Sequence, residues 1–147
     1  GLTGAEWIEF FESKDTEIGF LVKSLLLNKA FTPTNGTIFH IAVLKASLFP
    51  DQNRSTSKIC AEAANRRLRS PNAEVACLIR ATFSDKEFRD MGLSWLSVMH
   101  KYIDDADGDP SLLGIGENDD RRWLLYACCD GPESEWAKDG GFAFLAP

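Results

Sequence analysis

The sequence predicts an α+β fold: about five N-terminal helices, within residues 3–91, packed on a C-terminal four-stranded antiparallel β-meander, residues 94–146. Two patterns predict this division. Up to residue 91 apolar side chains recur at helical spacing and follow capping residues. Beyond it, four apolar runs are separated by clusters of Asp, Gly, Pro and Asn, which is typical of strands joined by turns. Because the helices precede the strands, we expect them to cover one face of the sheet.

The length and composition of the chain are those of one ordinary domain. The chain has 147 residues, of which 44% are hydrophobic and 26% charged. A chain of this size and composition buries enough apolar surface to fold without disulfides or a structural metal. We therefore expect residues 1–147 to form a single α+β domain.

Two or three helices are expected before residue 50, because residues 13–15 either break the first helix or form a polar patch within one longer helix. Thr3 and Glu6 form a capping-box pattern, which predicts a helix over residues 5–13. A second helix follows from an apolar stripe with spacing i, i+3, i+4, i+7 and i+8, made by Ile18, Leu21, Val22, Leu25 and Leu26. Residues 37–49 are apolar almost all round, which favours a central helix that Pro50 ends.

Further helices are expected up to residue 92. One follows the polar loop 51–57 and runs to about residue 69. Ser70 and Pro71 suit the start of a helix over residues 72–82, although alternating apolar residues there leave a strand open. Ser84 and Glu87 form a second capping box, whose short helix Gly92 ends.

Four strands are expected in the C-terminal part. The apolar period changes to two from Trp95 to Ile103, and two further runs cover residues 112–115 and 123–129. Phe142 and Phe144 mark the last strand. The connections between these runs are rich in Asp, Gly and Pro.

Composition removes several classes of function. A net charge of −6 argues against non-specific binding to nucleic acid. The chain has no apolar run of about 18 residues and no visible signal peptide, so we expect no membrane span. Four cysteines without a CxxC spacing, with two histidines, assemble no zinc site, and we expect no metal or other cofactor. Free thiols would indicate a reducing, cytoplasmic location.

An acidic connection over residues 104–110 resembles a calcium loop only in part. Asp105, Asp107 and Asp109 alternate as EF-hand ligands do. However, Pro110 stands where the loop needs Gly, and Gly116 stands where it needs a bidentate Glu. A solvated turn is therefore the expected structure.

His100 and Cys60 are the candidate catalytic residues. A histidine in a strand can act as a general base, and a cysteine in the first turns of a helix can have a lowered pKa. Cys60 precedes His100 and an acidic residue such as Asp104 or Asp130, which is the chain order of papain-like cysteine hydrolases. The residues around Cys60 lack the glycine-rich segment of that family, and the sequence is assigned to no family. The alternatives are a small apolar core residue for Cys60 and a hydrogen-bonded edge residue for His100.

The candidate binding residues are Arg66, Arg67 and Trp136. The two arginines belong to a basic cluster that contrasts with the acidic C-terminal half and is completed by Arg54, Lys58 and Arg69. A solvated helix face is the alternative for this cluster. Trp136 lies in a polar loop, either as a lid over the sheet or as an exposed interface anchor.

The function we expect is that of a small acidic binding or regulatory module. It would act through contact with a protein partner or with a second copy of itself. The alternative is a hydrolase or transferase that uses Cys60 and His100 at a site between the helices and the sheet. The sequence leaves open whether the chain is an enzyme.

Overall fold

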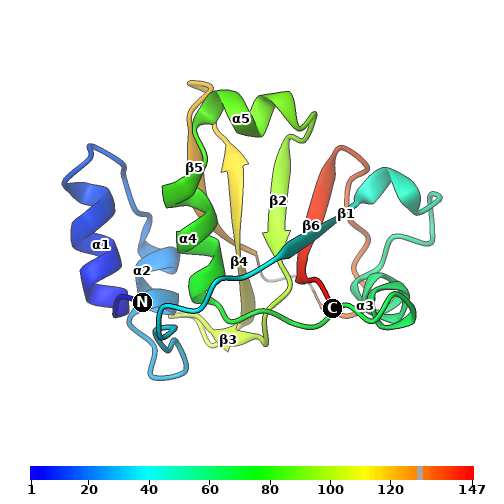
Figure 1. Ribbon diagram of the computed structural model, residues 1–147, viewed down its shortest axis with the longest axis horizontal. Helices are drawn as coiled ribbons and strands as arrows, with labels where there is room; N and C mark the ends of the chain where they lie inside the picture. Colours follow the sequence, from blue (N-terminus) through cyan, green and yellow to red (C-terminus); the bar gives the residue numbers. More distant parts are fainter. Residues whose placement is uncertain (129–130) are drawn as a thin grey trace.

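A computed structural model describes residues 1–128 and 131–147, which fold as a mixed α+β structure (Figure 1). Its helices are α1 Gly4–Glu12, α2 Phe20–Leu26, α3 Thr56–Asn65, α4 Glu74–Thr82, α5 Asp85–Asp90 and the 3-10 helix η1 Ala46–Leu48. Its strands are β1 Ile41–Lys45, β2 Trp95–Val98, β3 Ile103–Asp104, β4 Pro110–Glu117, β5 Trp123–Cys128 and β6 Gly140–Leu145. The mixed α+β class is thus confirmed.

The sheet is not the four-stranded meander that the sequence suggested. Its described strands run in the order β1-β6-β2-β4-β3, and β5 pairs with β4. The last strand, β6, lies between β1 and β2, antiparallel to the first and parallel to the second. Gly140–Leu145 takes this inner position because it is buried on both faces, with Phe142 and Phe144 on one and Ala143 on the other.

The expected helix over residues 37–49 is wrong. This segment instead forms β1 and then η1. β1 pairs with β6 from Ile41 opposite Leu145 to Lys45 opposite Gly141. A segment that is apolar on all sides suits a buried helix or a strand with both faces covered, so its period does not separate the two. The segment forms a strand because it pairs with β6, about 100 residues later in the chain.

The helices also do not all cover one face of the sheet. Two clusters of buried side chains lie on its two faces. One cluster joins α1, α2, α4 and α5 to the sheet through Leu96, Val98, Leu113, Ile115 and Ala143. The other joins α3 and η1 to it through Leu44, Leu112, Phe142 and Phe144. Because neighbouring strand residues point to opposite faces, the sheet lies between two layers of helices.

Several local predictions are confirmed. Both capping boxes form, with Thr3 before α1 and Ser84 before α5. Gly92 adopts the left-handed conformation after α5, with φ +71°. The segment that could have been helix or strand is helix α4. The helix expected to reach residue 69 ends earlier, since α3 stops at Asn65.

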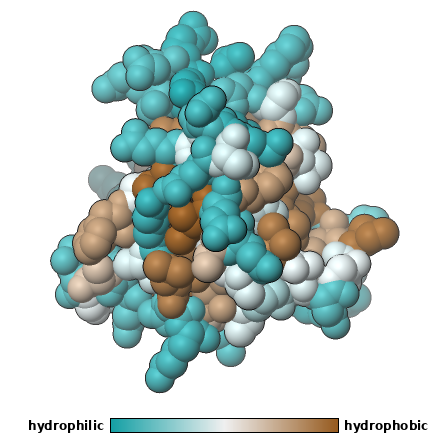
Figure 2. Space-filling model, turned by 90° about the vertical axis from the view of Figure 1, so that its left-hand side faces the viewer, coloured by the Kyte–Doolittle hydropathy of each residue, from teal (hydrophilic) through white to brown (hydrophobic). Residues whose placement is uncertain are grey.

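The side of the molecule that carries α1 and α2 is mainly hydrophilic, with apolar side chains gathered in its middle (Figure 2). On α2, Phe20 is 74% exposed. Within the described residues, no helix has the length and apolar character needed to cross a bilayer.

Candidate functional site

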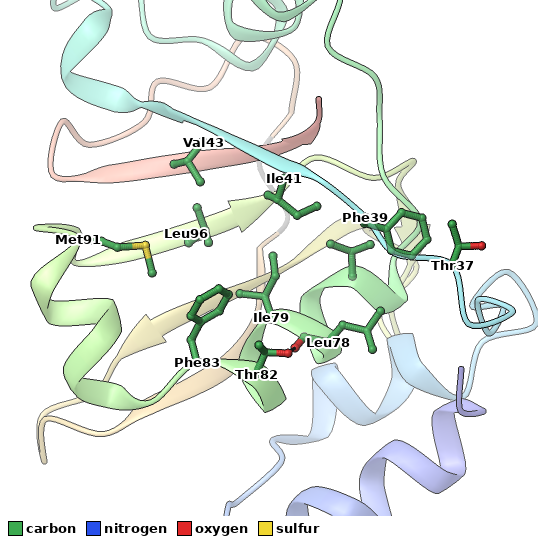
Figure 3. A pocket seen from close by; sticks show the side chains of 11 residues that line it. Thr37, Phe39, Ile41, Val43, Leu78, Ile79, Thr82, Phe83, Met91 and Leu96 are labelled. Carbon is green, nitrogen blue, oxygen red and sulfur yellow. Dashed lines mark hydrogen bonds between the residues drawn. The ribbon is translucent and has the colours of Figure 1, made fainter. Parts of the chain in front are cut away.

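An apolar groove lies between β1 and α4, with a cavity volume of about 450 Å³. We call it the β1–α4 groove. Its walls and floor come from β1, α4, β2 and the residue after α4, through Ile41, Val43, Leu78, Ile79, Leu96 and Phe83. These side chains point toward one another across the groove in Figure 3. Val43 and Phe83 are 37% and 39% exposed, so apolar surface is open to solvent there.

The position of α4 explains why the groove exists. α4 packs mainly against β4 and β5. The half of the sheet formed by β1 and β6 therefore lies to the side of α4 (Figure 1). On β1, Ile41 is partly buried and Val43 is exposed. On the opposite face, Leu44 is buried in the cluster that contains α3. β1 is thus covered on one face and open on the other.

β1 also presents a free edge. Among the described residues it has one neighbouring strand, β6. The N–H of Ala146 donates to the carbonyl of His40 over 2.8 Å, and this pair stands directly before the Ile41–Leu145 pair. Because hydrogen-bonded pairs alternate in antiparallel ladders, the backbone groups of Ile41 and Val43 point away from β6. Their side chains line the groove, so free backbone groups and an apolar surface lie next to each other.

His100 is buried just beyond β2, with both ring nitrogens engaged. Nδ1 lies 2.6 Å from the carbonyl oxygen of Lys101, which can only accept, so Nδ1 carries the proton. Nε2 accepts the backbone N–H of Leu113 over 2.9 Å. Burial lowers the pKa of His100, which favours the neutral ring. The imidazole thus accepts a hydrogen bond from β4 just beyond the last residue of β2. Neither ring nitrogen keeps a lone pair for a substrate.

The structure does not assemble the predicted catalytic group around His100. Cys60 is exposed on α3, and the hydrogen bonds of the His100 ring go to Lys101 and Leu113. Asp104 is exposed in β3, while Asp130 lies outside the described residues. The helix was expected to lower the pKa of Cys60, but partial desolvation of the sulfur raises it. Catalysis by Cys60 and His100 therefore stays a prediction without geometric support.

Alkylation of Cys60 tests this prediction directly. We expect iodoacetamide to react slowly at pH 7, because a raised pKa keeps the thiol protonated. The rate should rise about tenfold per pH unit up to pH 9, following the thiolate fraction. Mass spectrometry of the modified peptide measures it, with Cys60→Ser as the blank. A rate that levels off below about pH 8 would show a lowered pKa and would support the catalytic role.

Arg54 is a structural residue and not part of a solvated basic face. It is 7% exposed, and its guanidinium donates to the carbonyls of Ala46, Phe49 and Trp136 over 2.9–3.1 Å. The same group pairs with Asp51 at 2.9 Å. Arg54 therefore holds η1, the following loop and the loop of Trp136 together.

Arg66 and Arg67 are exposed at the end of α3. Arg66 pairs with Glu62 at 2.6 Å, an exposed pair one helical turn apart. Arg67 has φ +59°, a conformation that stops the helix. Both are exposed, but they follow the end of α3 and do not line the β1–α4 groove. Their role in binding a partner stays a prediction.

Trp136 is folded back onto the sheet. It is 7% exposed, and its Nε1–H donates to Oγ1 of Thr56 over 2.8 Å. Its ring lies 5.3 Å from those of Trp95 and Phe142. Of its two expected positions, lid and exposed anchor, the structure shows the lid.

The acidic connection forms an internally bonded turn. The carboxylate of Asp105 accepts the N–H groups of Asp107 and Asp109 and the hydroxyl of Ser111 over 2.9–3.0 Å. Burial opposes ionisation of Asp105, but these hydrogen bonds prevail and lower its pKa. Within residues 1–128 and 131–147, no three His, Cys, Asp or Glu side chains are grouped so that they could hold one metal ion.

Sequence reasoning missed the groove because residues 37–49 were assigned to a helix. One signal was present: Ile38, Ile41 and Val43 are β-branched, a residue type that favours strands. Of these, Ile41 and Val43 alone alternate, which is too few residues to outweigh the fully apolar pattern.

Comparison with known proteins leaves the site to be interpreted from its geometry. No protein-family model matches the chain, and neither the curated proteins nor the solved structures contain a significant match.

Proposed function

We propose that this chain is a protein-binding module that takes an extended segment of a partner along the free edge of β1. The supporting observation is that the outward backbone groups of Ile41 and Val43 lie directly beside the β1–α4 groove. In strand addition, main-chain hydrogen bonds supply affinity and pockets for alternate side chains supply specificity. Every second side chain of an added strand would lie on the groove face and contact Leu78 or Phe83.

The groove calls for apolar residues at alternate positions of the partner. Its lining is aliphatic and aromatic, with Thr37 and Thr82 as the polar exceptions. Exposed edge strands are usually protected by charge, proline or a covering loop. β1 carries one charged residue, Lys45, at its end, so its central part remains open to pairing.

Replacing Val43 by proline tests the edge. The Val43 N–H points away from β6, so proline removes a donor to the partner without removing a hydrogen bond of the sheet. Peptides selected from a random displayed library should show alternating apolar residues, and Val43→Pro should weaken their binding at least about tenfold, measured by fluorescence polarisation. Val43→Thr keeps the N–H and the shape of the side chain, and should weaken binding less.

Phe20→Ser is the matched control, because it removes an exposed apolar side chain on α2, outside the groove. It should leave peptide binding unchanged, and circular dichroism should show that every variant keeps the native fold. Equal binding by wild type and Val43→Pro would exclude the edge of β1 as the docking site. Sedimentation of the free protein tests self-association. If the protein is a dimer and Val43→Pro dissociates it, the segment bound at β1 belongs to a second copy of the chain.

A further inference from the structure

A second cavity, of about 600 Å³, lies on the other face of the sheet over β2, β4 and β5. Leu96 of β2 lines the β1–α4 groove, whereas its neighbour Trp95 lines this cavity, and successive strand residues point to opposite faces. We call it the aromatic cavity. The lining residues on which its chemistry depends are Trp95, Tyr126, Trp136, Glu117, Glu135 and Leu124.

Glycines let the aromatic rings lie against the sheet. A Cβ on Gly114 would stand 2.4 Å from Cζ of Tyr126, and one on Gly140 would stand 2.0 Å from the ring of Trp95. Both distances are far below van der Waals contact, so these rings occupy space that any other residue would fill. The result is a surface of aromatic rings in which Trp95 and Trp136 stand 5.3 Å apart, with their planes inclined by 30°.

The polar atoms of both indoles are already used. Nε1–H of Trp95 donates to Oδ1 of Asp139 over 3.2 Å, and that of Trp136 donates to Thr56. What the two rings can offer a ligand is therefore π surface. The face of an aromatic ring carries negative charge density and attracts cations.

The charge around the cavity has the matching sign. Its described lining contains two carboxylates, Glu117 and Glu135, and no Lys or Arg. Glu117 has arginine partners outside the lining, Arg121 at 3.5 Å and Arg89 at 3.8 Å. Glu135 accepts the backbone N–H of Arg54 over 3.1 Å, and the described residues show no ion pair for it.

We infer that the aromatic cavity binds an organic cation, and specifically an alkylated ammonium group. Three aromatic residues and a carboxylate around an apolar wall recognise a cation that is large and weakly hydrated. Leu124 and Ala137 contact methyl groups well but cannot replace the water shell of a metal ion, which needs several oxygen ligands. This inference is independent of strand addition at β1, because the two sites lie on opposite faces of the sheet.

Titration with tetramethylammonium and with choline tests the inference on the full chain. Quenching or a shift of tryptophan fluorescence, checked by isothermal titration calorimetry, should show saturable binding. The neutral isostere 3,3-dimethylbutan-1-ol matches choline in shape and should bind at least about tenfold more weakly, because it lacks the cation–π attraction. Equal binding of choline and this alcohol would overturn the inference, as would the absence of saturation by either cation.

Two pairs of variants locate the site. Tyr126→Leu should weaken choline binding at least about fivefold, whereas Tyr126→Phe, which keeps the ring, should retain it. Glu135→Gln keeps an oxygen for Arg54 and removes the charge, so it should weaken choline binding with no loss of the fold. If Tyr126→Leu fails to fold, Glu135→Gln still tests the site, with Glu133→Gln as the neighbouring control. Equal effects of these two variants on choline binding would overturn the assignment.

Two further ligands complete the test. A peptide bearing trimethyllysine, compared with the unmodified peptide, distinguishes a protein-borne ammonium from a free one, and preference for either supports the inference. Maltose tests the alternative that the aromatic side chains of the cavity stack on a sugar ring. Binding of maltose without binding of either ammonium compound would overturn the inference.

Discussion

Replacing Glu74 by alanine is expected to lower the free energy of unfolding by roughly 3 kcal/mol or more, because one buried and two partly buried donors would lose their acceptor. Glu74 is fully buried at the start of α4. Its Oε1 accepts the N–H of Leu2 over 2.5 Å and Nε1–H of Trp7 over 2.8 Å. Its Oε2 accepts the N–H of Thr34. One carboxylate thus ties α1, the loop before β1 and α4 together, and urea unfolding measures the loss.

Glu62→Ala is the control for this prediction. Glu62 pairs with Arg66 on the exposed side of α3, and pairs of this kind contribute about 0.5 kcal/mol or less. A loss of stability in Glu74→Ala no larger than in Glu62→Ala would show that the three donors find other partners.

The pH dependence of stability in the acid range gives an independent test of the role of Glu74. Burial disfavours its charge, but hydrogen bonds from Thr34, Leu2 and Trp7 prevail and lower the pKa below its ordinary value of 4.5. Its stabilising contribution is therefore complete above about pH 4.5 and is lost as the pH falls through the lowered pKa. In Glu74→Gln this part of the pH dependence should disappear. An unchanged acid transition in that variant would contradict the role of Glu74.

Replacing His100 by alanine is expected to cost roughly 2–4 kcal/mol, from a lost acceptor and a cavity in a buried site. The N–H of Leu113 would be left without its partner Nε2. His40 is exposed, so His40→Ala is a matched control that should change stability by less than about 0.5 kcal/mol. Thermal and urea unfolding measure both. Similar results for the two variants would show that the His100 hydrogen bonds do not hold β2 and β4.

The pH dependence of His100 runs in a defined direction. Burial lowers its pKa, so the unfolded chain binds a proton more readily than the folded one. Its stabilising contribution is complete above about pH 6.5 and declines as the pH falls below that value. His100→Gln keeps an acceptor for Leu113 but does not titrate, so its stability should vary less between about pH 6.5 and 5. A dependence as steep as that of wild type would assign the transition to other groups.

The two largest stability effects belong to polar residues whose roles depend on distant partners. Glu74 meets Leu2 and Thr34, which lie 72 and 40 residues away. His100 meets Leu113 through a backbone N–H, a group that every residue but proline carries. No pattern within either segment could indicate these contacts, because neither partner is distinguished by its side chain. His100 was predicted as a possible base, and its surroundings instead use both nitrogens for structure.

The dependence on distant partners also explains which candidate sites could be predicted from the sequence. Trp136 was singled out, and it lines the aromatic cavity, but its neighbours Trp95 and Tyr126 come from strands that only the sheet brings together. The β1–α4 groove joins residues 41 and 43 to residues 78–83, so it exists only after α4 packs on the far half of the sheet. Both sites are consequences of strand order.

The sequence alone determined the features whose hydrogen bonds close within a few residues. These are the capping boxes at Thr3 and Ser84 and the left-handed Gly92. Tertiary structure alone decided that residues 41–45 form a strand and that β6 lies between β1 and β2. A strand completes its hydrogen bonds with another segment, so its identity depends on a partner that, for β1, lies about 100 residues away. The free edge of β1 and both cavities follow from that pairing.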